Sequence, residues 1–399
     1  MNIYNQNNTS ALPNSILYQP SCLTSMPMSA ETDDSWGNGG SGIGTGSEAI
    51  RAALGEYFER RHFYMEVMPD LTDNLRLSMS ESESKSFCKA LHQTCEENKL
   101  LDDIWNHKFQ LSEVYRASDL SLCHVPTACI SLSAHKIEND STIYPLRDTC
   151  GCSFHWDPMI AIFGSLKEQL ERQFLTKFWL TKKCRKIIPI NIAVSKLNNA
   201  HSAKLYRCLA LAGDTTVIDI SDSSFPGACV LIVYGSAANT RHVKYCAGMA
   251  YAASFEEALD KSIRELWQTF RFIDLFNATN SEHKKIEDPY LRHFLSCNNY
   301  RTYQEITTTL QTYEKVPHNK ERFDALGLIK TLKTQGINGF IYIKPITIEN
   351  SNYFASKYLS PDLFLHMNNS QNINIRNRYS DSFFHEIDNT RKDSMVPFP

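Results

Sequence analysis

Three pairs of oxygen-bearing side chains stand three residues apart in segments with helical periodicity, each beside bulky apolar residues. Residues i and i+3 of a helix project from one face, so each pair presents two oxygens to the same neighbour. Carboxylate pairs on different helices suit Mg²⁺, which prefers hard oxygen ligands and usually completes its shell with substrate phosphates. We therefore predict a magnesium–nucleotide site. The three pairs are Glu56 and Glu59, Glu168 and Glu171, and Glu265 and Gln268. The predicted magnesium ligands are Glu56, Glu59, Glu168 and Glu171.

Two arginines directly follow the first two pairs, Arg60 after Glu59 and Arg172 after Glu171. The planar fork of a guanidinium matches phosphate oxygens, so these side chains are candidate phosphate contacts. The alternative for any single pair is a solvated helix surface, where Glu at i and i+3 beside Arg is common. Three such pairs favour a shared cleft, although periodicity alone does not establish that the helices converge.

A glycine-rich stretch over residues 37–46 precedes the first of these helices, which helical spacing predicts over residues 47–66. Backbone N–H groups at a helix N-terminus, with the helix dipole behind them, can hold a phosphate. The stretch is not a Walker sequence, so a flexible lead-in is the alternative.

Strand-like and helical stretches alternate through the rest of the chain, which is typical of an α/β or α+β fold with mixed sheets. The expected strands cover residues 125–134, 187–194, 215–221, 228–235 and 340–348, and the expected helices cover 158–180, 201–212 and 254–275. A polar segment between about 71 and 109 has a helical pattern. We predict an irregular arm over residues 1–40, one large domain over 41–380 that carries the ATP and magnesium site on its helices, and a tail over 381–399.

The composition is that of an ordinary globular enzyme, with 42% hydrophobic and 21% charged residues. A formal net charge of −3 argues against a protein that grips nucleic acid. The N-terminus has no basic start followed by an apolar run, so no secretory signal is expected and the predicted location is the cytoplasm. No stretch approaches the roughly 20 apolar residues that a membrane helix needs, so no membrane association is expected.

The chain has twelve cysteines, which in a protein without an export signal are expected to be reduced thiols. The one close pair, Cys150 and Cys152, lies in the sequence DTCGCSFH. A structural zinc site needs four ligands, usually from two such pairs, and no second pair exists. A tight glycine turn with buried thiols is favoured over a zinc site.

Three longer motifs carry a resemblance to the YcaO family: GIGTGSEAIRAALGEYFERR, CGCSFHWDPMIAIFGSLKEQLERQ and GMAYAASFEEALDKSIRELWQ. Their order and spacing over residues 42–275 resemble the family pattern of two helices ending Glu-x-x-Glu-Arg and a third with Glu-x-x-Gln. The chain is similar in particular to the cyclodehydratase subunits of microcin-B-type thiazole/oxazole synthetases, in RDTCGCSFH, RHFLSCN, SPDLFLHMNNS and the final MVPFP. The resemblance implies a YcaO-type fold that binds ATP and Mg²⁺, with the Glu and Gln pairs as ligands.

The sequence departs from the general family pattern at four positions. The family often has Ser at the position of Ala52, an acidic residue at Ile160, Asn at Cys150 and Arg at Phe270. We carry no role over to Ala52, Ile160 or Phe270, and the effect of these departures on the site is left open.

The resemblance implies an ATP-dependent cyclodehydratase that converts Cys and Ser residues of a ribosomally made precursor peptide to thiazoline and oxazoline rings, as in microcin-like antibacterial peptides. It also implies two partners, a zinc-containing E1-like peptide-recognition subunit and an FMN-dependent azoline dehydrogenase. Two alternatives are another YcaO reaction, forming a thioamide or amidine, and a noncatalytic scaffold subunit.

A proline-rich tail often delivers a terminal carboxylate to the active site of YcaO cyclodehydratases. By this resemblance the carboxylate of Pro399 is the candidate general base, stiffened by Pro397. A disordered tail with incidental prolines is the alternative. His155, in CSFHW, is a weaker candidate for the base.

Overall fold

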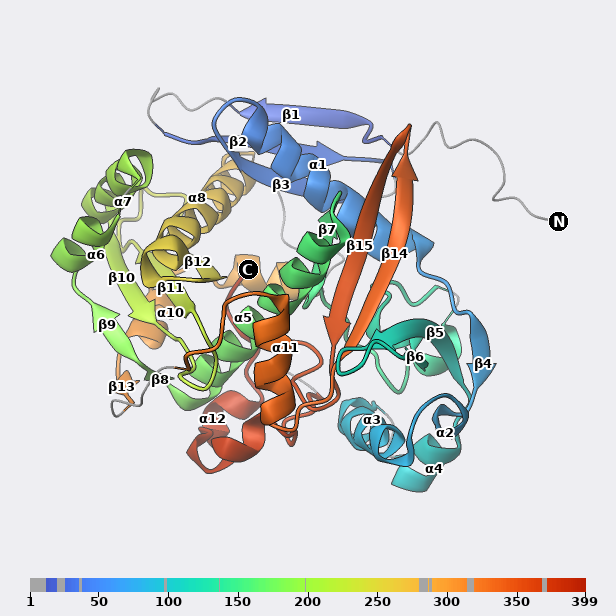
Figure 1. Cartoon of the computed structure of the whole chain (residues 1–399). Helices are drawn as coiled ribbons and strands as arrows, with labels where there is room; N and C mark the ends of the chain where they lie inside the picture. The colour runs from blue at the N-terminus through green and yellow to red at the C-terminus, as the bar shows by residue number, and fades with distance from the viewer. Residues whose placement is uncertain are drawn as a thin grey trace.

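The structure is a computed structural model with helices packed between and around antiparallel sheets (Figure 1). It describes residues 12–19, 26–35, 38–96, 99–135, 137–197, 199–279, 286, 289–313, 319–367 and 372–399. Residues 1–11, 20–25 and 36–37 of the predicted arm lie outside these ranges. In the described residues no helix is both long and apolar enough to cross a membrane.

The glycine-rich stretch is a strand, where a loop was predicted. Strands β1 (Ser15–Gln19), β2 (Met28–Asp33) and β3 (Gly39–Gly44) form an antiparallel sheet over helix α1 (Ser47–Arg61), seen at the top of Figure 1. A Cβ at Gly40 or Gly42 would lie only 2.1 or 2.0 Å from a carbonyl oxygen of α1. The glycines therefore allow β3 to lie directly on the helix backbone. The same pairing corrects the prediction of an irregular arm, because β1 and β2 lie within residues 1–40.

Helix α5 (Pro158–Thr181) runs through the middle of the molecule and contacts two different sheets. On one side the order of the six-stranded sheet is β4 (Leu71–Asp73), β5 (Phe109–Arg116), β14 (Phe340–Ile348), β15 (Ser351–Leu359) and β7 (Cys152–His155), with β6 (Leu122–Pro126) paired to β5. Of the predicted strand 125–134 only the first two residues are in β6, because Thr127–Cys129 form a 3₁₀ turn after Pro126.

The four-stranded sheet on the other side of α5 has the order β12 (Tyr245–Ala252), β11 (Ala228–Gly235), β10 (Asp214–Asp219) and β9 (Lys186–Ile188). Helices α7 (Ala200–Ala212) and α8 (Phe255–Ala278) match their predicted ranges closely. The predicted strand 187–194 is wrong beyond Ile188: Pro189 caps helix α6 (Ile190–Lys196), since proline lacks the N–H that a central strand donates.

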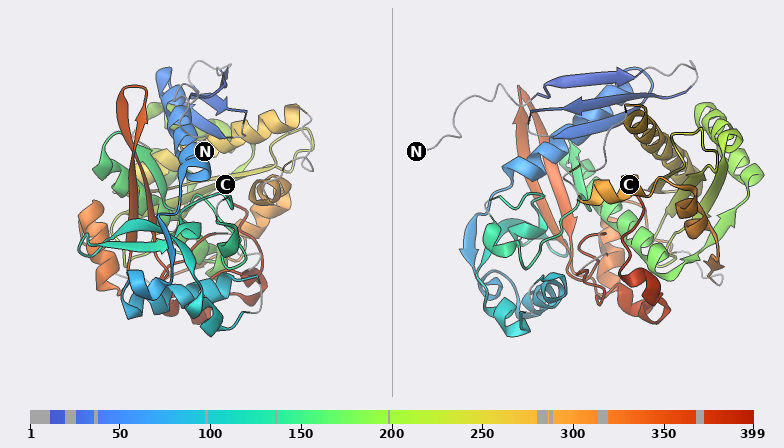
Figure 2. Two further views of the ribbon diagram at one scale, coloured as in Figure 1. Left: turned by 90° about the vertical axis from the view of Figure 1, so that its right-hand side faces the viewer. Right: turned by 180° about the vertical axis from the view of Figure 1, so that it is seen from behind.

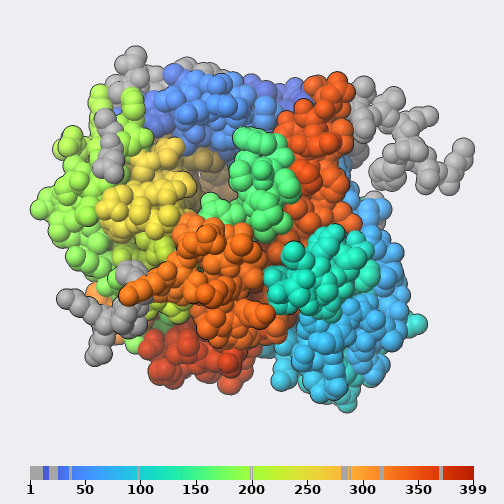
Figure 3. All heavy atoms as spheres, viewed as in Figure 1, coloured from blue at the N-terminus to red at the C-terminus, as the bar shows by residue number. Residues whose placement is uncertain are grey.

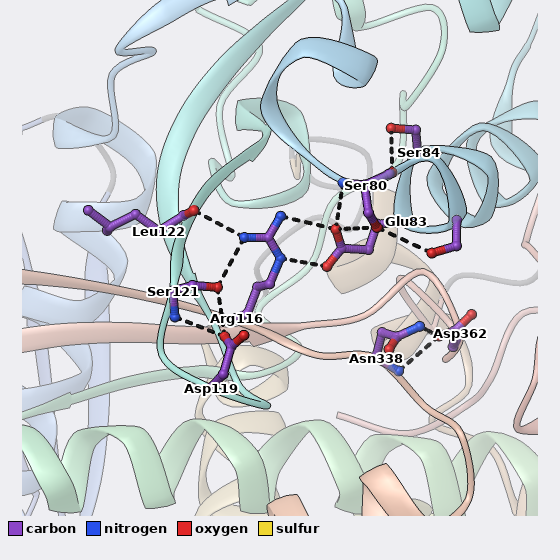
Figure 4. A network of polar contacts seen from close by, with 10 residues as sticks. Ser80, Glu83, Ser84, Arg116, Asp119, Ser121, Leu122, Asn338 and Asp362 are labelled. Atoms are coloured by element: carbon purple, nitrogen blue, oxygen red, sulfur yellow. Dashed lines mark hydrogen bonds and ion pairs between the residues drawn. The ribbon is translucent and has the colours of Figure 1, made fainter.

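The predicted polar helical segment contains three helices, α2 (Leu75–Ser78), α3 (Glu81–Thr94) and α4 (Leu101–Asn106), which pack against the six-stranded sheet around a second hydrophobic core. A polar network joins α3 to the β5–β6 hairpin (Figure 4). In it, Arg116 donates to both carboxylate oxygens of Glu83, at 2.7 and 3.0 Å.

The larger core lies around α5, the four-stranded sheet and α8, and it also includes the C-terminal residues. Around it are α9 (Pro289–Ser296), α10 (Tyr300–Thr307), α11 (Ala325–Thr334), α12 (Asn389–Lys392) and a short parallel pair, β8 (Lys183–Cys184) with β13 (Gln311–Thr312). The chain ends near the middle of the molecule, beside α9 (Figure 2). The predicted mixed fold of helices and sheets in one large domain is confirmed.

Candidate functional site

A cavity of about 380 Å³ opens between helices α1, α5 and α8, and all eight Glu, Gln and Arg side chains selected from the sequence line it. Figure 3 shows the surface hollowed where these three helices meet. The volume lies within the range of ordinary small-molecule sites, about 300–1,000 Å³. The predicted residues in its wall are Glu56, Glu59, Arg60, Glu168, Glu171, Arg172, Glu265 and Gln268.

Strand β3 holds the α1 and α8 side chains in place through Ser41. The backbone N–H of Ser41 donates to Glu56 at 2.8 Å, and its carbonyl accepts from Gln268 at 3.2 Å. Arg60 forms an ion pair with Glu56 one turn along α1. One strand residue thus links the first and third predicted pairs.

Strand β12 holds side chains of α5 and, again, of α8 by the same kind of bond. The N–H of Tyr251 donates to Glu171 at 2.7 Å, and the N–H of Met249 donates to Glu265 at 2.8 Å. Residues two apart on a strand face the same way, so β12 offers α5 and α8 neighbouring donors. Each of these carboxylates retains a second oxygen that can meet a ligand.

Burial and mutual repulsion raise the pKa values of the carboxyl groups in the cavity wall. Burial, reinforced by Glu56, raises the pKa of Glu59 to about 7. Burial and the neighbouring Glu171 raise the pKa of Glu265 to about 8. The pKa of Glu168 is also raised, by burial and then by Glu59. The charged forms of these carboxylates therefore disfavour one another, and a cationic ligand would relieve that repulsion and lower their pKa values.

The C-terminal tail runs into this region. An oxygen of Pro399 accepts a hydrogen bond from Nη1 of Arg172 at 2.7 Å, and the ring of Phe398 is fully buried against Phe178 and Trp179. Arg172 meets Glu168 only at 3.8 Å. The guanidinium therefore lies between the tail and the carboxylates of the cavity.

The donor set fits a magnesium–nucleotide complex better than a bare ion. Among the described residues, no group of three or more His, Cys, Asp or Glu side chains is arranged to hold a metal by itself. Mg²⁺ in nucleotide enzymes usually takes one or two carboxylates and fills its shell with phosphate oxygens and water. The four predicted magnesium ligands line one cavity without forming a closed cage, and their role stays a prediction.

Several residues of the site carried no signal in the sequence. Lys167 and Lys261 line the same cavity, and burial followed by the charge of Lys261 lowers the pKa of Lys167. Glu31, on β2, accepts from the hydroxyl of Ser41 at 3.0 Å, and its pKa rises to about 7 through burial. Lys167 directly precedes Glu168 on α5, and this adjacency is the one local feature that could have indicated it. Ser41 and Glu31 reach the site through strand pairing.

Other predicted features lie outside the cavity. At the N-terminus of α1, Glu48 accepts from the N–H and hydroxyl of Thr45, and no described residue of the glycine-rich stretch is in the cavity wall, so the prediction of a phosphate held at this junction has no support in the cavity. His155 accepts from the N–H of Asp157 at 3.0 Å and is not in the cavity wall. Ala52, Ile160 and Phe270 are also absent from that wall.

The predicted glycine turn at the cysteine pair is confirmed. Cys152 donates its N–H to Thr149 at 2.9 Å, Gly151 has φ 73°, and both thiols are buried and free. A Cβ at Gly151 would lie 2.3 Å from the carbonyl oxygen of Tyr358. Glycine is required here for both reasons.

Comparison with known proteins gives the same family by sequence and by structure. Residues 39–362 match the family model described as YcaO cyclodehydratase, ATP- and Mg²⁺-binding. The chain is 34% identical over 405 residues to the microcin B17-processing protein McbD of Escherichia coli, covering 100% of both chains.

Solved structures agree. The E. coli microcin synthetase McbBCD complex with pro-MccB17 bound contains a chain with a TM-score of 0.89 and 33% identity, covering 99% of both chains. YcaO from Methanopyrus kandleri, bound with AMPPCP and Mg²⁺, matches with a TM-score of 0.55 and 12% identity over 89% of this chain and 87% of that one. At this identity the second match supports the fold alone.

Proposed function

This chain belongs to the YcaO family of ATP- and Mg²⁺-binding cyclodehydratases, and we propose that it forms azoline rings in a precursor peptide as part of a microcin-B-like synthetase. The observation that carries the proposal is the meeting of three helices around one acidic cavity, with an oxygen of Pro399 held by Arg172 of its wall. We assign the substrate as Cys and Ser residues of a ribosomally made peptide. The products are thiazolines and oxazolines.

The reaction balances as follows. The thiol or hydroxyl of the substrate residue attacks the carbonyl carbon before it, and its proton leaves to a base. Magnesium–ATP supplies the phosphoryl group that makes the former amide oxygen a good leaving group. Departure of phosphate and loss of the amide proton form the C=N bond, so the peptide loses one water per ring while ATP becomes ADP and phosphate.

The residues of the cavity wall bind and orient the reactants. Glu56, Glu59, Glu168 and Glu171 would hold the magnesium ion, and Glu265 and Gln268 would complete the nucleotide site. Arg60 and Arg172 would meet phosphate oxygens with their planar forks. Phosphoryl transfer depends mainly on such positioning and on charge neutralisation, with little covalent chemistry by the protein.

The carboxylate of Pro399 is proposed as the base. One of its oxygens accepts a hydrogen bond from Arg172, which lines the cavity. A substrate held in the cavity would therefore be close to a carboxylate that Arg172 orients. Pro397 limits the freedom of the tail, because its ring fixes φ. This assignment gives the tail a chemical role in addition to its packing in the core.

We further propose that the chain works with a zinc-containing E1-like peptide-recognition subunit and an FMN-dependent dehydrogenase that oxidises azolines to azoles. Support comes from the full-length likeness to a subunit of the McbBCD complex. The isolated chain should then cyclise precursor slowly or not at all.

Reconstitution tests the proposal. The chain, the proteins of its neighbouring genes and the precursor peptide are incubated with and without ATP, and mass spectrometry records the loss of one water per ring. Omission of each partner is the control. Exchange of oxygen for sulfur in the product would indicate a thioamide-forming enzyme, and ATP that stays intact in the full complex would indicate a scaffold subunit.

A further inference from the structure

The last six residues are held along their backbone by side chains from the body of the protein. Four carbonyl or carboxyl oxygens of the tail accept hydrogen bonds of 2.7–2.9 Å from donors on α5, β12 and α9. The pairs are Trp179 Nε1 to Ser394, Tyr245 hydroxyl to Pro397, Tyr290 hydroxyl to Phe398, and Arg172 Nη1 to Pro399.

These contacts recognise the backbone at set positions. Pro397 and Pro399 have no N–H to donate, so their segment cannot pair as an ordinary strand, and its oxygens are left for side-chain donors. Tyr245 is fully buried, and a buried hydroxyl without a partner is unfavourable. The carbonyl of Pro397 at 2.8 Å meets that need, so each of the two groups satisfies the other.

The two tyrosine donors are neutral, and this matters beside an acidic cavity. A lysine or arginine at either place would be attracted to the carboxylates of the wall, of which Glu168 and Glu265 have raised pKa values because burial and nearby carboxylates disfavour their charge. A tyrosine hydroxyl donates to a carbonyl and carries no charge, so these carboxylates do not attract it. Arg172, which lines the cavity, donates to the terminal oxygen.

We propose that Tyr245 and Tyr290 are positioning residues that set the register of the tail, so that the carboxylate of Pro399 lies on Arg172 at the cavity. An extended chain advances about 3.3 Å per residue, so a slip by one position would take the carboxylate out of hydrogen-bond reach. The inference rests on the proposed function of the tail as base. It adds the two tyrosines that position this base. They act through the tail and do not contact the substrate.

The test uses Tyr245→Phe, Tyr290→Phe and the double variant in the reconstituted complex. Tyr144→Phe is the matched control, because Tyr144 is a buried tyrosine whose hydroxyl also donates to a carbonyl, that of Leu365 at 2.9 Å, away from the tail. Three quantities are measured: kcat for ring formation, KM for ATP, and hydrogen exchange of the backbone N–H groups of Val396 and Phe398.

Each lost bond should lower kcat about three- to tenfold, the range expected for a typical net hydrogen bond, and the double variant about 10- to 100-fold. KM for ATP should stay within about twofold, and the tail amides should exchange faster. Tyr144→Phe should leave kcat and tail exchange unchanged, even if it lowers Tm as much as the tail variants do. A merely structural role of Tyr245 and Tyr290 would lower Tm without this split between kcat and KM.

Two results would overturn the inference: unchanged tail exchange in the double variant, or faster exchange with wild-type kcat. The proposed function fails in a different way, namely if the wild-type complex gives no ATP-dependent loss of water. In that case the exchange measurement still reports whether the two tyrosines hold the tail.

Discussion

Two regions of the molecule in which glutamate meets arginine show opposite results. In the network that joins α3 to the β5–β6 hairpin, Arg116 binds Glu83 through two nitrogens and also donates to Ser121 and Leu122, while Ser80 donates to the same carboxylate (Figure 4). Burial would raise the pKa of Glu83, but the hydrogen bonds from Arg116 and Ser80 outweigh it and the pKa is lowered. Here the fold satisfies both charges.

In the cavity the pairing is incomplete. Arg172 approaches Glu168 only to 3.8 Å, its Nε is buried with no hydrogen-bond partner, and the pKa of Glu168 is raised by burial and by Glu59. A Glu–Arg pair can therefore be fully hydrogen-bonded and stabilise the fold, as at Glu83 and Arg116, or be incomplete at a cost in stability, as at Glu168 and Arg172. The second arrangement is typical of sites that are completed by a ligand.

The largest effect should come from moving the tail carboxylate, an oxygen of which accepts the 2.7 Å hydrogen bond from Arg172. Appending a few residues after Pro399, or deleting Pro397–Pro399, should lower ring formation by about 10²–10⁴-fold, the usual contribution of a positioned base. ATP binding should change little. The same residues added before Met1 are the control. A C-terminally extended protein with wild-type kcat would show that the tail only packs.

Removing negative charge from the cavity wall should lower turnover and leave assembly with the partner subunits intact. Glu168→Gln and Glu59→Gln should lower kcat by about 10²–10³-fold, as loss of one preorganised electrostatic contact does. Rates are measured at limiting Mg²⁺, where a lost ligand has most effect. Glu83→Gln is the matched control from the fully hydrogen-bonded pair and should keep kcat. Normal turnover of Glu168→Gln would remove it from the magnesium set.

Breaking the ion pair of Arg116 and Glu83 should lower stability and leave turnover unchanged. Arg116→Met leaves the carboxylate of Glu83, which is 12% exposed, without its charged partner, and should lower the free energy of unfolding by about 1.5–3 kcal/mol. Ring formation per folded molecule should be unchanged. Urea unfolding midpoints and kcat are measured together. If Arg116→Met lost activity with no loss of stability, the division between the two regions would be wrong.

The smallest expected effect is in the pH dependence of stability. Glu59 and Glu265, with pKa values of about 7 and 8, bind protons more tightly in the folded than in the unfolded chain, so they stabilise at low pH and that stability is lost as pH rises from about 4.5 to about 8. Glu83, with a lowered pKa, has the opposite sign, and its stability is lost only as pH falls below about 4.5.

The free energy of unfolding of the free protein, and with it Tm, should therefore fall between pH 6 and 8. Glu59→Gln should flatten this slope by roughly 0.5 kcal/mol per pH unit, about a third of the one-proton limit because Glu59 is partly exposed. Glu83→Gln should leave the slope unchanged over the same range. A slope that Glu59→Gln does not alter would mean that Glu59 is already charged in the folded protein.

Much of the site could be selected from the sequence because its signal is local. The spacing of Glu56 and Glu59, or of Glu168 and Glu171, depends only on the pitch of a helix, and the helix ends at residues 158–181 and 255–278 were predicted within three residues. The prediction of a strand over 187–194 failed because apolar periodicity outweighed Pro189, a local stop signal that was present in the sequence.

The sequence by itself determined the ligand types, their spacing on each helix and the family to which the chain belongs. Only the tertiary structure decided that α1, α5 and α8 surround one cavity, that backbone N–H groups of Ser41, Met249 and Tyr251 orient three of its carboxylates, and that the tail meets Arg172. Helical spacing is set within one turn, whereas these contacts join residues 15 to 227 positions apart. Such contacts depend on which elements pack together, and no local pattern encodes that choice.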